Sequence, residues 1–79
     1  MSSHSFSDIT QSQWIRACQK LGLVVYRGYG KGSHARIEHP QTKAKYTIQY
    51  NLHKFINMKI FKKMMEWGFE EERIWEALK

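Results

Sequence analysis

The stretch that decides the fold of this chain is residues 31–40, KGSHARIEHP. It predicts a strand that begins after a glycine turn and ends at Pro40, because proline interrupts a strand's hydrogen-bond ladder. Side chains alternate between the two faces of a strand. Ala35 and Ile37 suit packing on helices, so His34 and Arg36 are expected to share the opposite face. Two residues apart, they would stand about 7 Å from each other, within reach of one phosphodiester.

Two further strands are expected to flank this one. Residues 23–27 are β-branched and aromatic, and residues 44–50 alternate between apolar and polar side chains. Glycines in the turn 28–32 supply unusual backbone angles, and residues 41–43 make the next turn. Links this short favour an antiparallel meander.

Helices are expected before and after the strands. Residues 10–13, TQSQ, match a capping box that starts a helix ending near Leu21. Asn57 is predicted to cap a second helix that runs to about Trp67. Residues 70–78 suit a short last helix with acids in its first turn.

The order of these elements predicts an α+β fold. We expect α-β-β-β-α, with an antiparallel three-stranded sheet, helices on one face and a short C-terminal helix. A flexible N-terminal segment, residues 1–9, would precede a single domain over residues 10–79.

Positive charge is concentrated in the middle of the chain. The formal net charge is +6, and eleven of the 13 lysines and arginines lie between Arg16 and Lys63, opposed there only by Glu38. A field of this kind attracts nucleic acid without regard to sequence, although a solvated basic surface fits it too. The predicted phosphate contacts are Lys31, Arg36, Lys45, Lys59, Lys62 and Lys63.

Composition also excludes several kinds of site. Cys18 is the single cysteine, which excludes an internal disulfide and a cysteine zinc cluster and favours a packing role.

No stretch reaches the roughly 18 apolar residues of a membrane span. The first residues lack the features of a signal peptide, so a cytoplasmic protein is expected. No cofactor and no metal are expected, because His34, His39 and His53 have no carboxylate or thiolate at ligand spacing.

The chain resembles the HicA family of bacterial toxins, also called YcfA-like, over roughly residues 10 to 78. The resemblance rests on a helix that ends in Leu21-Gly22, the Gly32-Ser33-His34 motif, His39-Pro40, a third strand, and a helix that ends in Trp67-Gly68-Phe69. It departs from the family pattern in the extra turn residues 28–30, at Ile37, where an aromatic residue is usual, and at Ala35, where a second polar residue or histidine is common.

The resemblance implies a fold like a double-stranded-RNA-binding domain and an endoribonuclease that cleaves translated mRNA. It also implies one essential histidine, matched here by His34, and neutralisation by a HicB-type antitoxin protein. The chemistry agrees, because an imidazole can accept or donate a proton near neutral pH and a neighbouring cation can stabilise charge on phosphate.

Two other functions remain open from the sequence. One is an RNA-binding module without catalysis that uses the same basic surface, and the other is a protein-interaction domain for an acidic partner. A structural strand histidine is the alternative for His34. His39 is expected to be a turn residue and His53 a loop residue.

Overall fold

The first helix begins as the sequence predicts. A computed structural model of the chain describes residues 5–27 and 34–79. In it α1 spans Gln11–Lys20, and the capping box is present. The Thr10 hydroxyl accepts a hydrogen bond from the Gln13 amide at 3.3 Å, and the Thr10 amide donates to the Gln13 Oε1 at 2.8 Å. Gly22 follows the helix with a φ of 88°, a conformation that favours glycine.

The three strands form one antiparallel sheet in the order β1-β2-β3. The strands are shorter than predicted and span Val24–Arg27, Ala35–Glu38 and Lys45–Ile48. The central strand β2 pairs with both neighbours, so Ile37 stands opposite Val25 on one side and Tyr46 on the other. Residues 28–32, the predicted glycine turn, lie outside the described residues.

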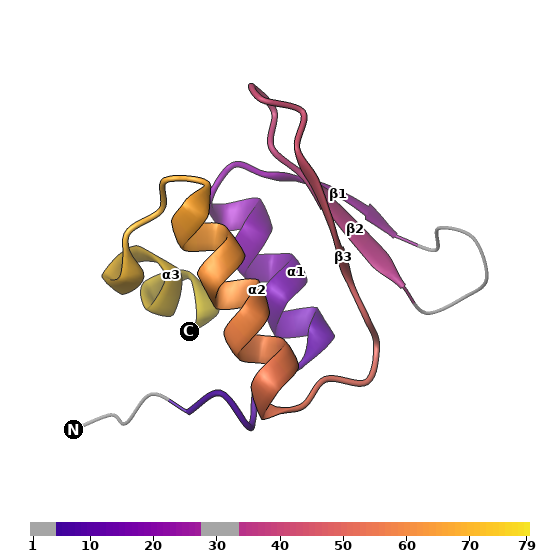
Figure 1. The fold of residues 1–79 in the computed structure, drawn as a ribbon, viewed down its shortest axis with the longest axis vertical. Coiled ribbons are helices and arrows are strands. Elements are labelled where there is room, and N and C mark those ends of the chain that lie inside the picture. Colours follow the sequence, from indigo (N-terminus) through magenta and orange to yellow (C-terminus); the bar gives the residue numbers. More distant parts are fainter. Residues whose placement is uncertain (1–4, 28–33) are drawn as a thin grey trace.

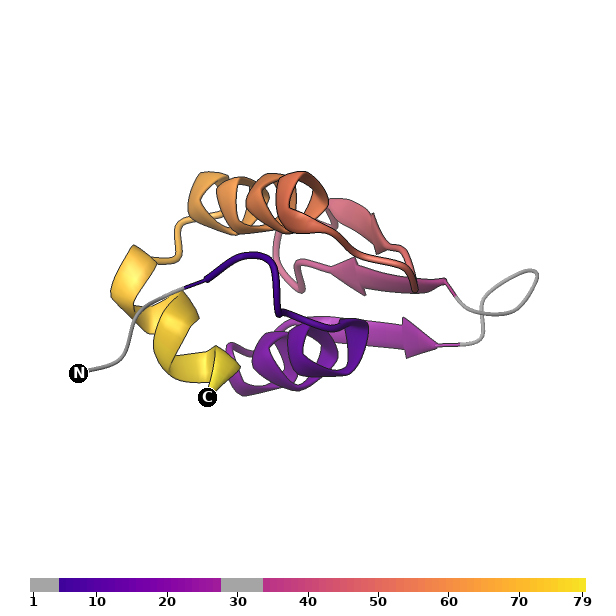
Figure 2. The same ribbon diagram turned by 90° about the horizontal axis from the view of Figure 1, so that it is seen from below.

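Helices α1 and α2 (Lys54–Glu66) cover one face of the sheet, and α3 (Glu71–Leu78) packs on the side of the helices away from it (Figure 1). Figure 2 shows α1 and α2 as a separate layer beside the strands. The predicted α-β-β-β-α order with a terminal helix is confirmed. None of the described helices has the length and apolar character needed to cross a membrane.

The core lies between the sheet and the helices. Ile37 and Ile48 from the sheet meet Trp14, Ile60 and Met64 from α1 and α2, all fully buried. Cys18 is buried among them, as predicted, and burial raises the pKa of its thiol to about 12. A thiol in this state is a packing group and a poor nucleophile at neutral pH.

The prediction that Asn57 caps the second helix is wrong. The helix begins at Lys54, three residues earlier, and Asn57 lies inside it with a fully buried side chain. The Trp14 indole N–H donates to the Asn57 Oδ1 at 2.9 Å, and the Asn57 amide donates to the carbonyls of Phe6 and Ile9. Asn57 therefore joins α2 to α1 and to the residues that precede α1.

Part of the stretch expected to be flexible contacts this core. Ile9 is buried, and the Phe6 ring packs against Phe61 and Trp75 with centroids 5.3 and 5.1 Å away. These contacts place the residues just before α1 beside both α2 and α3. The residues 1–4 lie outside the described part of the chain.

Replacing Asn57 with alanine should destabilise the fold. The change leaves the buried Trp14 N–H and the Ile9 carbonyl without partners, so we expect a loss of about 2 to 4 kcal/mol in the free energy of unfolding. Urea unfolding followed by tryptophan fluorescence measures it. The control Asn51→Ala, at an exposed position, should change stability by less than about 0.5 kcal/mol. A loss below about 1 kcal/mol for Asn57→Ala would contradict this role.

Candidate nucleic-acid interface

The face of the sheet turned away from α1 and α2, called here the open face, carries the predicted polar residues. Its first cross-strand row is Tyr26, Arg36 and Thr47, and its second row is Val24, Glu38 and Lys45. No described helix covers this face (Figure 1). The row positions follow from the alternation of β2, whose Ala35 and Ile37 are 2% and 0% exposed on the other face. The predicted alternation of this strand is therefore confirmed.

His34 lies at one end of the open face. It is exposed and stands one residue before β2, rather than inside the strand as predicted. A shallow hollow of about 220 Å³ is lined by His34, Ala35, Arg36 and Thr47. The structure thus brings His34 and Arg36 to one hollow and adds the Thr47 hydroxyl from β3. An imidazole, a guanidinium and a hydroxyl can together contact one phosphodiester.

Tyr26 and Glu38 form a pair on the open face that the sequence analysis does not predict. The Tyr26 side chain is 45% exposed and lies on the same face as Glu38, one cross-strand row away. Hydrogen bonding to the Glu38 carboxylate and its negative charge raise the pKa of Tyr26. The pair places an exposed aromatic ring directly across from Arg36. The alternation of side chains along β1, with Val25 facing the helices, is enough to predict that Tyr26 lies on the open face. The interaction of Tyr26 with Glu38 depends in addition on the register between β1 and β2.

The six cations predicted to contact phosphate do not share one surface. Arg36 and Lys45 lie on the open face, while Lys59, Lys62 and Lys63 belong to α2, on the other side of the sheet. Lys31 lies outside the described residues. Lys63 forms an ion pair with Glu66 at 3.2 Å, and its ammonium lies 5.7 Å from the ring centroid of Tyr46. Lys63 is therefore held against the helix-covered side of β3.

The other histidines have local roles. The Nδ1 of His39 accepts hydrogen bonds from the amides of Gln41 and Thr42 at 3.2 and 3.3 Å, and its ring meets Trp67 edge to face at 5.9 Å. These bonds hold the turn between β2 and β3, which confirms the turn role of His39. His53 is exposed at the start of α2 and makes no side-chain cap. In the described part of the chain, no three His, Cys, Asp or Glu residues are grouped as metal ligands.

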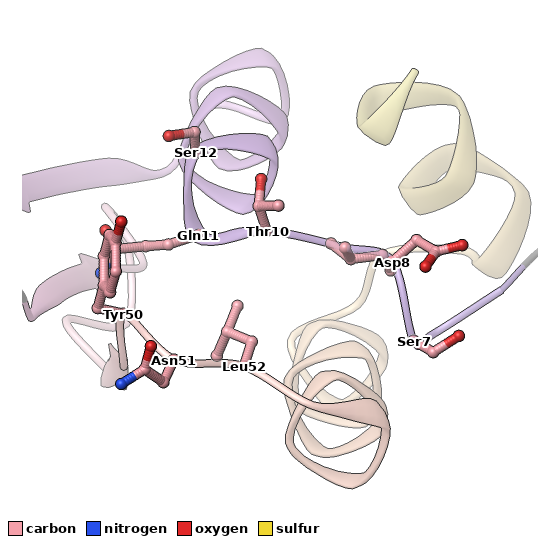
Figure 3. Close-up of a pocket in the computed structure, with 9 residues that line it drawn as sticks. Ser7, Asp8, Thr10, Gln11, Ser12, Tyr50, Asn51 and Leu52 are labelled. Atoms are coloured by element: carbon pink, nitrogen blue, oxygen red, sulfur yellow. The ribbon is translucent and has the colours of Figure 1, made fainter.

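A larger hollow of about 610 Å³ lies at the start of α1, and His34 is not among its lining residues. Figure 3 shows its lining side chains, which come from residues 7–12 and from residues 50–52 after β3. Two of its polar groups already support the fold. Thr10 caps α1, and the Gln11 amide donates to the Ile48 carbonyl at 3.0 Å. None of the predicted site residues that the structure describes lines this hollow.

The Tyr26–Glu38 pair can be tested by titration. Because Glu38 keeps the phenol protonated to higher pH, Glu38→Gln should lower the pKa of Tyr26. The measurement is the pH dependence of the Tyr26 ring carbon signals by NMR, assigned with Tyr26→Phe. Glu66→Gln, which removes a distant carboxylate on α2, should leave the Tyr26 midpoint in place. An unchanged midpoint in Glu38→Gln would show that the two side chains do not interact in solution.

Comparisons with known proteins assign no family to this arrangement. No protein-family model, no curated protein and no solved structure matches the chain. The case for a function therefore rests on the residues of the open face and of the His34 hollow.

Proposed function

We propose that the protein is a metal-independent endoribonuclease of the HicA toxin type, which cleaves mRNA. The observation that carries this proposal is the hollow that His34 shares with Arg36 and Thr47. An exposed imidazole beside a guanidinium suits a reaction that moves a proton next to a phosphate. The net charge of +6 favours encounter with RNA. The proposal also draws on the Gly32-Ser33-His34 motif and its resemblance to the family.

In the proposed reaction the nucleophile comes from the RNA itself. His34 accepts the proton of a 2′-hydroxyl, and the 2′-oxygen attacks the adjacent phosphorus. The bond from phosphorus to the 5′-oxygen breaks, which leaves a 2′,3′-cyclic phosphate and a 5′-hydroxyl. Arg36 stabilises the negative charge that develops on the phosphoryl oxygens. The leaving oxygen takes its proton from water or from the protonated His34.

The surroundings of His34 favour a modest rate. The lining residues that the structure describes include one imidazole and no carboxylate. Glu38 lies four residues along the strand from His34, or about 13 Å at the rise of an extended chain, too far to serve the same phosphate. With these described residues alone, His34 would both remove and return protons, or water would assist. General acid–base catalysis by one group contributes roughly 10²- to 10⁴-fold.

A toxin of this kind requires an inhibitor, and we propose a HicB-type antitoxin with an acidic surface. Arg36 and Lys45 on the open face would attract it, and opposite charges accelerate association. By covering His34 and Arg36 it would exclude RNA. A stable complex buries about 1,600 Å² in total, which is a large part of one face of a 79-residue chain. Such a pair would act in the cytoplasm, where mRNA is translated.

The second candidate is an RNA-binding module without catalysis. It is favoured by one observation, that His34 is the one proton-transferring side chain among the described residues that line the hollow. The exposed ring of Tyr26 beside Arg36 also suits base stacking next to a phosphate contact. Cleavage and binding therefore have to be measured separately.

Replacing His34 with alanine should abolish cleavage and leave binding within about threefold. The measurement is cleavage of a labelled RNA in EDTA, with affinity for the 2′-deoxy analogue measured in parallel by fluorescence anisotropy. We expect a loss of at least about 10²-fold in rate, the low end of acid–base catalysis. His53→Ala, at an exposed position outside the hollow, should cleave at the normal rate. Equal cleavage by His34→Ala and the unmodified protein would exclude His34 as the catalyst.

The open face should supply the phosphate contacts. Removing one phosphate contact lowers the slope of log affinity against log salt by about 0.7 for a single strand. Arg36→Gln and Lys45→Gln together should therefore reduce the slope by about 1.4. Lys59→Gln with Lys62→Gln, on α2, removes the same charge and should change the slope by much less. The reverse result would move the RNA site from the sheet to α2.

A further inference from the structure

The outer face of α2, away from the core, carries large apolar side chains. Phe55, Met58 and Met65 are 67%, 42% and 46% exposed, half of the six exposed large hydrophobic residues of the described chain. Positions 55, 58, 62 and 65 are three or four residues apart, so they follow one face of the helix. The opposite face, with Asn57, Ile60, Phe61 and Met64, is buried in the core. The helix α2 therefore exposes large apolar side chains on its outer face in addition to those that it buries in the core.

Lysines are interleaved with these apolar side chains. Lys54, Lys59 and Lys62 are all exposed on the outer half of α2. The carboxylate on this side, Glu66, forms an ion pair with Lys63 at 3.2 Å. The surface thus combines apolar anchors with net positive charge. We call Phe55, Met58, Lys59, Lys62 and Met65 the α2 face.

The chemistry of the α2 face matches a protein better than RNA. A phosphate backbone would contact the lysines and leave the two methionines in water, whereas burying these side chains is favourable by about 25 cal/mol per Å². Exposed methionine is typical of surfaces that bind helices, because its side chain adapts to different partners. The apolar residues Phe55, Met58 and Met65 are three and seven positions apart, which places them along one side of the helix, as in surfaces that bind an amphipathic helix. The stripe is about 15 Å long, or nearly three helical turns.

The described part of the chain does not offer such a partner helix. Its own acidic helix, α3, exposes Glu71, Glu72 and Glu76, but its apolar residues Ile74, Ala77 and Leu78 are buried. A second copy would bring either the acidic residues of α3 without exposed apolar anchors, or the anchors of its own α2 face together with more positive charge. The occupant must therefore be a different chain that presents both.

We propose that the α2 face docks an acidic amphipathic helix of a partner protein. The apolar side of that helix would cover Phe55, Met58 and Met65, and its carboxylates would pair with Lys59 and Lys62. The helix α2 that carries this surface lies on the helix-covered side of the sheet (Figure 2). A partner bound there leaves His34 accessible. The proposal does not depend on whether the protein cleaves RNA.

The test uses a synthetic helix with leucine on one side and glutamate along both edges of that side. The chain has four methionines, so methyl-labelled protein gives few NMR signals. Addition of the peptide should shift the methyl signals of Met58 and Met65, while Met64, fully buried on the other side of α2, stays in place. A shuffled peptide of the same composition and a peptide with lysine in place of glutamate should both bind at least tenfold more weakly.

Matched variants separate the contributions of charge and apolar contact. Lys59→Glu with Lys62→Glu should weaken peptide binding by at least about tenfold, and Phe55→Ser should do the same, as for the central anchors of other interfaces. Arg16→Glu with Arg73→Glu makes the same change in net charge at exposed positions of α1 and α3 and should leave binding within about twofold. Both sets alter exposed side chains, so folding is checked by urea unfolding.

The proposal would be overturned if something other than the acidic helix occupied the α2 face. An RNA oligonucleotide, or vesicles of phosphatidylcholine and phosphatidylglycerol, would then shift the methyl signals of Met58 and Met65. Self-association would shift the same signals as the protein concentration is raised, and sedimentation would detect it. Absence of peptide binding at millimolar concentration, or shifts centred on Arg36 and Thr47, would overturn it too. Peptide binding with the expected pattern in a protein that does not cleave RNA would support the docking surface and reject the proposed enzyme.

Discussion

The alternation of the central strand β2 is the constraint on which the rest of the structure depends. It is the strand that pairs on both sides, and its Ile37 is fully buried between the sheet and the helices. Because a strand has a period of two, burying Ala35 and Ile37 forces Arg36 and Glu38 outward. A shift of the register by one residue would bury a guanidinium and expose the centre of the core. The hydrophobic core thus fixes which side chains reach the open face, and the candidate site is a consequence of packing.

The same layering divides the positive charge of the chain into two surfaces. The sequence presents one basic region, but helices on one side of a sheet and an open face on the other turn it into two groups of cations. Arg36 and Lys45 lie beside polar residues and Tyr26, whereas Lys59 and Lys62 lie among exposed apolar side chains. Charge alone does not distinguish the two groups of cations, but the residues around them do. The polar neighbours on the open face suit a polyanion, and the apolar neighbours on α2 suit a protein.

Local signals in the sequence predict most of the fold, and interactions between distant residues account for the errors. The capping box of α1 and the alternation of β2 depend on neighbours within a few positions, and both are confirmed. The prediction for Asn57 fails because an asparagine near a helix start is typical of a cap. Its buried partner, Trp14, lies 43 positions away. The pairing of Tyr26 with Glu38 escapes prediction for the same reason, since it requires the register of two strands.

The burial of Ala35 bears on how this chain could perform HicA-like chemistry. The family pattern often has a polar residue or a histidine at this position, but here the side chain is 2% exposed and belongs to the helix-covered face. A polar side chain at position 35 of this fold would point to the helix-covered face and not to the open face. The groups beside His34 that reach the open face are instead Arg36 and, across the sheet, Thr47. Among the described residues, strand parity thus places one imidazole in this hollow, so the proposed cleavage would draw its remaining rate from charge and from the position of the RNA.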